Sequence, residues 1–262
     1  MHKDLAGRHA LVCGGSEGIG LAAATALAER GADVTVLARR PGRLSEVAAA
    51  LPRAHESQRH GFVTADAGDT DGLAAQVAAL CESRPVHVLL NNTAGPPGGP
   101  AHAADPQAFV DVFRQHLVAG QVLVQAVLPG MKAAGWGRIV NVISTSVKEP
   151  IANLGVSNTV RGAVASWAKT LATELGPFGI TVNNVLPGYT RTQRLDQILA
   201  ERARATGKSE EDIAKGMLAT VPAGRFAEPA EVAAAIAFLA SPAAGYVNGI
   251  NLPVDGGRTK SL

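Results

Sequence analysis

A glycine-rich turn near the start of the chain has the residue types and spacing of a phosphate-binding loop. Residues 11–20 read Leu-Val-Cys-Gly-Gly-Ser-Glu-Gly-Ile-Gly, between a short apolar run and an Ala-rich stretch. Gly14 permits the tight bend, Gly18 lets backbone approach a pyrophosphate, and Gly20 lets helix and strand pack closely. The free N–H groups at the helix start favour negative charge. The turn predicts a dinucleotide site, and the alternative is a strand-to-helix turn without a ligand.

The end of the next predicted strand, residues 33–38, indicates which dinucleotide is expected. An acidic side chain there would accept the ribose 2′-OH of NAD, whereas an arginine can pair with the 2′-phosphate of NADP. Ala38 stands at the position of the acid, and Arg39 and Arg40 follow it. These residues favour NADP over NAD. The alternative is two solvated arginines on a surface turn.

Short apolar runs alternate with Ala-rich helical patterns along the whole chain. Strands are expected at residues 9–13, 33–38, 61–65, 86–91, 138–143, 180–186 and 249–254, and helices at 19–30, 42–51, 71–82, 106–134, 156–175 and 229–240. Val232, Ile236 and Leu239 share one apolar helix face. The alternation predicts one α/β domain over residues 1–262, a doubly wound, Rossmann-type parallel sheet of about seven strands with helices on both faces.

The charged segment 189–225 interrupts this alternation and predicts one or two exposed helices between the last two strands. Loops at the carboxyl ends of parallel strands form ligand sites, so we expect a lid over a pocket. The alternative is a solvated surface excursion.

Composition argues against several classes of protein. With 24 basic and 22 acidic residues the net charge is +2, and no basic stripe for nucleic acid is present. Two cysteines and seven scattered histidines provide no disulfide framework and no metal-site spacing. No signal peptide or membrane span is evident. We expect a cytoplasmic protein that acts on a small molecule, without metal, nucleic acid or membrane.

Motifs from about Leu5 to Gly257 resemble those of one family. Besides the glycine turn they are Asn91-Asn92-Thr93-Ala94-Gly95, with Thr and Ala in place of Ala and Gly, then Pro187-Gly188 followed by Thr192, and Val254-Asp255-Gly256-Gly257. Together they resemble the short-chain dehydrogenase/reductase family, most closely its 3-oxoacyl-carrier-protein reductases. The resemblance implies a homotetramer or homodimer.

The resemblance also implies a set of coenzyme-binding residues. They are Gly14, Ser16, Glu17, Gly18, Ile19, Gly20, Arg39, Arg40, Asp66, Ala67, Asn92, Thr93, Ala94, Arg161, Pro187, Gly188, Thr190 and Thr192.

The family's reaction centre consists of Asn, Ser, Tyr and Lys, and this chain retains only the serine. Ser144 follows the strand 138–143. Thirteen residues later Ser157 stands where the family has Tyr, and four further on Arg161 stands where it has Lys. His116 takes the place of the Asn. The resemblance thus implies a catalytic set of His116, Ser144, Ser157 and Arg161.

These replacements remove the usual proton donor. An aliphatic hydroxyl is a much weaker acid than a phenol, whose pKa is about 10, and a guanidinium keeps its proton. Losing general acid catalysis lowers a rate by about 10²–10⁴-fold. His116, Tyr189 or Lys148 could replace it, since imidazole titrates near neutral pH. The alternatives are a hydrogen-bonded helix histidine, a lid-packing tyrosine and a solvated lysine, and for Arg161 an ion pair on the helix surface.

Two functions from different classes follow. The first is an NADP-dependent carbonyl reductase or alcohol dehydrogenase with non-standard catalytic residues, acting on a ketone or an acyl-carrier thioester. The second is a nucleotide-binding sensor, scaffold or lyase/cyclase that has lost hydride transfer. Replacing Ser157 by Tyr and Arg161 by Lys discriminates between them.

Overall fold

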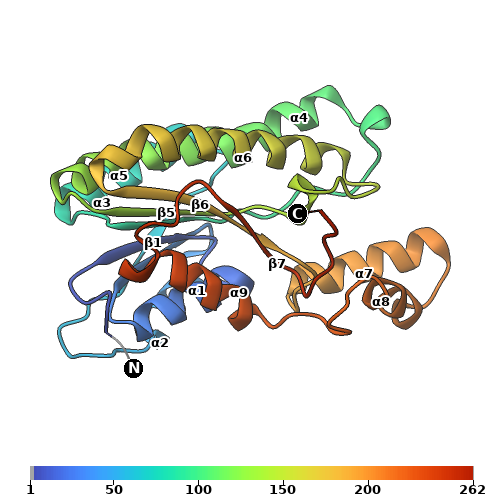
Figure 1. Cartoon of the computed structure of the whole chain (residues 1–262), viewed down its shortest axis with the longest axis horizontal. Coiled ribbons are helices and arrows are strands. Elements are labelled where there is room, and N and C mark those ends of the chain that lie inside the picture. Colours follow the sequence, from blue (N-terminus) through green and yellow to red (C-terminus); the bar gives the residue numbers. More distant parts are fainter. Residues whose placement is uncertain (1–2, 262) are drawn as a thin grey trace.

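Seven parallel strands form one sheet in the order β3-β2-β1-β4-β5-β6-β7 in the computed structural model, which describes residues 3–261 (Figure 1). The strands are β1 (His9–Cys13), β2 (Asp33–Ala38), β3 (Gly61–Thr64), β4 (Val88–Asn91), β5 (Gly137–Val142), β6 (Ile180–Pro187) and β7 (Asn251–Val254). The doubly wound sheet predicted from the sequence is confirmed. The largest errors at strand ends are at β4 and β7, which begin two residues later than expected.

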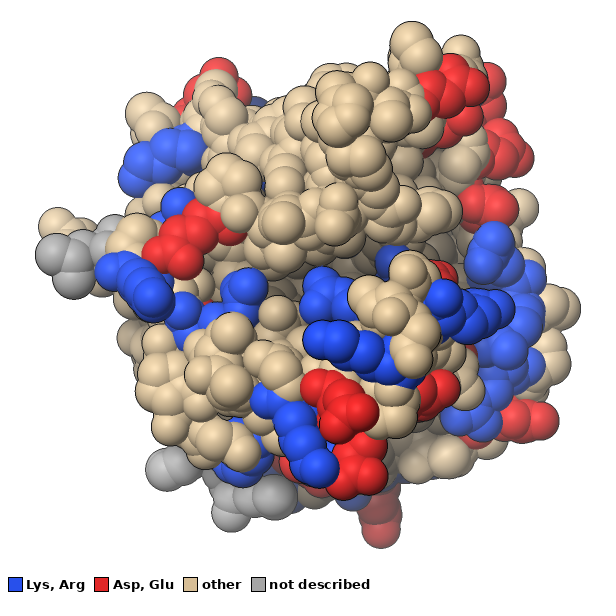
Figure 2. Space-filling view, turned by 90° about the vertical axis from the view of Figure 1, so that its right-hand side faces the viewer, with Lys and Arg blue, Asp and Glu red and all other residues tan. Residues whose placement is uncertain are grey.

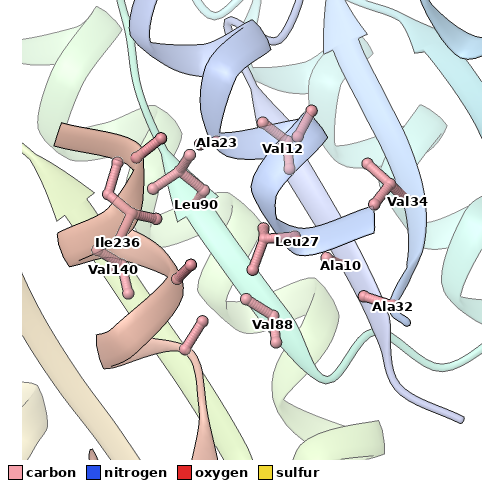
Figure 3. Packing of buried hydrophobic residues seen from close by; sticks show 14 of the residues in the cluster. Ala10, Val12, Ala23, Leu27, Ala32, Val34, Val88, Leu90, Val140 and Ile236 are labelled. Atoms are coloured by element: carbon pink, nitrogen blue, oxygen red, sulfur yellow. The ribbon is translucent and has the colours of Figure 1, made fainter. Parts of the chain in front are cut away.

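Helices cover both faces of the sheet (Figure 1). On one face lie α1 (Gly18–Glu29), α2 (Pro41–Ala50) and α9 (Pro229–Leu239), and on the other α3 (Thr70–Ser83), α4 (Pro106–Phe113), α5 (Ala119–Ala133) and α6 (Gly155–Leu175). Ala23 and Leu27 of α1 and Ile236 of α9 meet strand valines such as Val12 and Val140 in an aliphatic core (Figure 3). Small alanines let the helices approach each other closely, so few aromatic residues are needed to fill this core.

The helix expected at residues 106–134 is not one regular helix. Between α4 and α5 the segment Arg114–Val118 forms a π-helical turn, and His116 lies within it. A π turn adds one residue to the helical repeat and changes the direction in which its side chains point. Apolar periodicity in the sequence does not reveal such an insertion, and this part of the prediction is corrected.

The segment between β6 and β7 contains the two exposed helices that were expected. They are α7 (Gln193–Thr206) and α8 (Glu210–Leu218), which project beyond the carboxyl edge of the sheet at the right of Figure 1. Leu195 of α7 and Met217 of α8 pack with Phe226 in a small apolar cluster. The two helices therefore have a core of their own.

An asparagine ladder crosses four strands at equivalent positions. Asn91 Nδ2 donates to Asn141 Oδ1, Asn141 Nδ2 to Asn184 Oδ1, and Asn184 Nδ2 to Asn251 Oδ1, each at 2.8 Å. The same residues are paired in the registers of β4 with β5, β5 with β6, and β6 with β7. Buried amides are costly without partners, so the ladder stabilises this register against slippage.

Within residues 3–261, no helix is both long and apolar enough to cross a membrane. The same residues contain no group of three or more His, Cys, Asp or Glu side chains that could hold a metal ion.

Burial of His9 makes the stability of the fold depend on pH. The ring is 2% exposed and contacts Thr35 Oγ1 at 2.8 Å and the Pro85 carbonyl at 3.1 Å. Burial, reinforced by the Arg84 cation, lowers the pKa of His9 from 6.5 to about 4. The folded protein thus favours the neutral ring, and this preference contributes fully to stability above pH 6.5.

We expect the free energy of unfolding to fall as pH is lowered from 6.5 towards 4, because only the unfolded chain binds a proton at His9 in this window. One such group contributes up to about 1.4 kcal/mol per pH unit. Urea unfolding at several pH values should show a shallower pH dependence for His9→Asn. The matched control is His102→Asn on the surface, which should keep the wild-type dependence. Equal slopes for His9→Asn and the wild type would contradict this assignment.

Candidate active site

The glycine turn between β1 and α1 is packed so tightly that side chains cannot replace its glycines. Gly14 has φ +61°, and a Cβ there would lie 2.6 Å from the Asn92 carbonyl oxygen. A Cβ at Gly20 would overlap the carbonyl oxygen of Gly14. At Gly18, with φ +55°, a Cβ would lie 3.2 Å from Thr192 Cγ2. The turn, the end of β4 and the segment after β6 therefore meet at one place, as a dinucleotide cradle requires.

The two arginines after β2 have different environments. Arg40 pairs with Glu17 across 2.9 Å on the surface, so its charge is already compensated. Arg39 is exposed and forms no ion pair among the described residues. Arg43, which the sequence reasoning missed, donates through Nε to the carbonyl of Ser16 in the glycine turn at 3.3 Å and pairs through Nη1 with Glu46 at 3.1 Å. The sequence could have indicated Arg43, because this residue lies in the first turn of the helix that follows β2.

The remaining predicted coenzyme residues lie at the same carboxyl edge. Asp66 and Ala67 follow β3, and Thr93 and Ala94 follow β4. Gly188 donates its N–H to the Val254 carbonyl at 2.9 Å, which ties the end of β6 to β7. Thr190 is buried and donates to the Gly188 carbonyl at 3.2 Å. Ser16 is buried, and Ile19 is half-buried at the start of α1.

Arg161 lies inside the protein beneath these strand ends. It is 7% exposed, and its Nη1 donates to the Val142 carbonyl at 2.8 Å, while Nη2 points to the Thr93 carbonyl at 3.5 Å. No carboxylate pairs with it among residues 3–261. Burial lowers its pKa to about 10, so the guanidinium remains protonated at neutral pH. The alternative of an ion pair on the helix surface is wrong.

His116 faces Arg161 across a small internal cavity. Its Nδ1 is hydrogen bonded to Thr93 Oγ1, and its Nε2 is buried without a partner among the described residues. Burial, together with the Arg161 cation, lowers the pKa of His116 to about 3. The ring is therefore neutral at pH 7, and the expectation that it titrates near neutrality is wrong. The cavity is about 30 Å³ and is also lined by Asn91, whose Oδ1 has no hydrogen-bond partner within residues 3–261.

Both predicted serines lie close to Arg161 in the fold. Ser144 follows β5, and its Oγ accepts a hydrogen bond from Ser146 N at 3.1 Å at the start of the short 3-10 helix Thr145–Val147. Ser157 is half-buried in the first turn of α6, one helical turn before Arg161. Residues four apart share a helix face, so Ser157 and Arg161 point the same way.

The two other candidate acids occupy different settings. The Tyr189 ring packs edge-on against Phe226 with centroids 6.2 Å apart, which supports the packing interpretation. Lys148 ends the short helix after Ser144, with its backbone N–H donating to the Thr145 carbonyl at 3.0 Å.

Two arginines near this edge were not identified from the sequence as site residues. Arg194 of α7 donates to the Pro96 carbonyl at 2.9 Å and thus ties α7 to the loop after β4. Arg258, near the C-terminus, donates to Thr145 Oγ1 at 3.3 Å. The charge-rich composition of residues 189–225 indicated a lid, whereas nothing in the local sequence distinguished Arg258.

Known proteins are similar to this chain in sequence and fold over nearly its whole length. A family profile described as enoyl-(acyl carrier protein) reductase matches residues 14–259. Cis-4-hydroxycyclohexanecarboxylate dehydrogenase of Sinomonas cyclohexanicum is 37% identical over 99% of both chains. 3-Oxoacyl-[acyl-carrier-protein] reductase FabG of Vibrio cholerae is 34% identical over 97% of this chain and 98% of its own. L-sorbose reductase from Gluconobacter frateurii, solved with NADPH and L-sorbose, superposes with a TM-score of 0.92 at 30% identity and complete coverage of both chains.

We expect Gly20→Ala to destabilise the protein by about 1–3 kcal/mol, because the added methyl group overlaps the Gly14 carbonyl. The same displacement of the glycine turn should weaken binding of NADPH. Thermal unfolding with and without NADPH measures both effects. The matched control is Gly42→Ala, where a Cβ meets nothing within 4 Å. Unchanged stability and NADPH binding in Gly20→Ala would refute the tight packing inferred for this turn.

Proposed function

Because this chain belongs to the short-chain dehydrogenase/reductase family, we propose that it is an NADP-dependent oxidoreductase with non-standard catalytic residues. It reduces a carbonyl compound or oxidises the corresponding alcohol. The observation that carries this proposal is the glycine cradle, in which Gly14 and Gly20 pack so closely against each other and against Asn92 that neither glycine has room for a Cβ.

The residues present fit a nicotinamide dinucleotide along one continuous path. The glycine turn would hold the pyrophosphate, Arg39 the 2′-phosphate, and Asp66 the adenine end. At the other end, Asn92, Gly188 and Thr190 would hold the nicotinamide part. When bound, the coenzyme supplies or accepts the hydride.

Arg161 and the two serines act on the oxygen of the substrate. Ser144 and Ser157 orient that oxygen through hydrogen bonds. The Arg161 guanidinium stabilises negative charge that develops there through its field, which acts over several ångströms in a poorly solvated site. His116 is neutral, and its bond to Thr93 Oγ1 holds the end of β4 in place.

Neither Arg161 nor His116 gives up a proton readily at neutral pH. Arg161 retains its proton, since its pKa is about 10, and His116 carries no second proton to give. The protein therefore works by orientation and electrostatic stabilisation, and the proton comes from solvent. We infer a turnover lower, by about 10²–10⁴-fold, than a centre with a well-placed general acid would reach.

The proposal also covers location, assembly and substrate. The free thiols of Cys13 and Cys81 support a reducing, cytoplasmic compartment. Exposed Val110 and Phe113 on α4 and Phe238 on α9 support a homodimer or homotetramer. The relatives' names support a small hydroxy or oxo compound or an acyl-carrier thioester. Helices α7 and α8 serve as the lid.

The direct test combines coenzyme binding with turnover. Isothermal titration calorimetry should show binding of NADPH, and a panel of ketones should cause loss of NADPH absorbance at 340 nm. If NADPH binds while no carbonyl or alcohol substrate is ever turned over, the non-redox nucleotide-binding function is favoured instead. Absence of any coenzyme binding would refute both functions.

We expect Arg39→Ala to lower the affinity for NADPH by about 10-fold and to leave the affinity for NADH unchanged, because only NADPH carries the 2′-phosphate. Calorimetry with both coenzymes measures the difference. Arg204→Ala, on the exposed face of α7, removes the same charge and should change neither affinity. An equal loss for NADPH and NADH in Arg39→Ala would contradict a contact with the 2′-phosphate.

We expect the double variant Ser157→Tyr/Arg161→Lys to reduce simple ketones at least about 10²-fold faster than the wild type, because a phenol beside an ammonium group restores general acid catalysis. NADPH oxidation at 340 nm gives the rates, and thermal unfolding confirms that the variant is folded. A folded variant that binds NADPH but shows no gain would contradict the roles assigned to these two positions.

A further inference from the structure

The C-terminal tail places one arginine at the substrate side of the proposed site. Arg258 donates through Nη1 to Thr145 Oγ1 at 3.3 Å, and its guanidinium carbon lies 4.9 Å from the centroid of the Tyr189 ring. Thr145 directly follows Ser144, and Tyr189 directly follows Gly188. Arg258 therefore connects the loop that carries the substrate-orienting serine with the segment assigned to the nicotinamide.

Backbone hydrogen bonds hold the tail in this position. Glu149 Oε1 accepts from the backbone N–H groups of Lys260, at 2.6 Å, and Ser261, at 2.8 Å. The carboxylate of Asp255 accepts from the N–H groups of Gly257 at 3.0 Å and Thr259 at 2.8 Å. Glu149 and Asp255 thus bond to the backbone of the tail, and neither forms an ion pair with Arg258 within residues 3–261.

Arg258 remains without an acidic partner in residues 3–261. Other arginines at the same edge of the sheet are paired, for example Arg191 with Glu228 at 3.0 Å and Arg225 with Glu231 at 2.6 Å. Arg258 forms no such pair, and its Nε is buried without any hydrogen-bond partner. A guanidinium that has no carboxylate partner favours an anion bound beside it, since hydrogen bonds between two charged groups are the strong ones.

The surface charge on this side agrees with an anionic ligand. Figure 2 views the side on which α7, α8 and the C-terminus lie, and it shows Lys and Arg side chains along the lower edge of a hollow. The wall above the hollow consists mainly of uncharged side chains (Figure 2). Figure 2 also shows Asp and Glu side chains just below these basic ones, so the positive charge is confined to the edge of the hollow, where it favours an anion.

We propose that Arg258 binds a carboxylate group of the substrate, so that the chain acts on an oxo acid or hydroxy acid and not on an uncharged ketone, alcohol or thioester. A single guanidinium presents a planar pair of donors that matches a carboxylate. The contact with the Tyr189 ring and the hydrogen bond to Thr145 fix the orientation of the Arg258 guanidinium relative to Ser144. The inference rests on the proposed function, because it assigns the substrate of that same site.

The test measures binding to the protein saturated with NADP⁺, so that it does not depend on turnover. Calorimetry compares three oxo acids with their neutral primary amides, namely 4-oxocyclohexanecarboxylate, 2-oxobutanoate and levulinate. In the wild type we expect at least one acid to bind about 10-fold or more tightly than its amide. Arg258→Gln should abolish this preference, and Arg258→Lys should retain part of it, because lysine keeps the charge but lacks the planar fork.

Lys260→Gln is the matched control, since it removes the same charge from the same exposed tail two residues away. It should keep the preference for the acid. The inference is overturned if no acid is preferred in the wild type, if folded Arg258→Gln keeps the preference, or if Lys260→Gln and Arg258→Gln lose it equally. Failure of NADP⁺ to bind at the start would instead refute the proposed function.

Discussion

The register of four parallel strands is the constraint on which the proposed site depends. The asparagine ladder from Asn91 to Asn251 fixes the register of β4, β5, β6 and β7 through three hydrogen bonds between side-chain amides, each 2.8 Å long. The segments that carry Thr93, Ser144 and Gly188 leave the sheet just beyond this ladder. A slip of one residue would leave buried amides unpaired and turn the side chains of that strand to the opposite face. Strand register and site geometry are thus stabilised by the same hydrogen bonds.

The site contains two arginines, Arg161 and Arg258, that form no ion pair among residues 3–261. Arg161 is buried between the ends of β4 and β5 and bonds only to carbonyl oxygens among the described residues. Arg258 donates to Thr145 Oγ1 in the segment after β5. The Arg161 cation also contributes to keeping His116 neutral. In the proposed reaction both arginines would stabilise negative charge, one near the reacting oxygen and the other on a carboxylate of the substrate.

Most of the fold could be predicted from periodicity, because a parallel sheet buried on both faces needs apolar strands that alternate with helices. The glycine turn was equally predictable, because the spacing of Gly14, Gly18 and Gly20 along the sequence is what a local bend between a strand and a helix requires. The π turn at His116 was not predictable, because one added residue leaves the apolar pattern almost unchanged. The pairing of Arg40 with Glu17 and the contact of Arg258 with Thr145 join residues 23 and 113 positions apart, and no local pattern encodes such contacts.

By itself, the sequence determined where along the chain the candidate site residues lie. It has a phosphate-binding turn after the first strand, cationic residues after the second, and Ser157 and Arg161 at the spacing at which the family has Tyr and Lys. Only the tertiary structure decided the protonation states of these groups and their ion pairs. A pKa depends on burial and on neighbouring charges, and both are set when distant segments pack together. For this reason His116 is neutral, Arg161 is a buried cation without an ion pair among the described residues, and Arg258 donates to Thr145, the residue after Ser144.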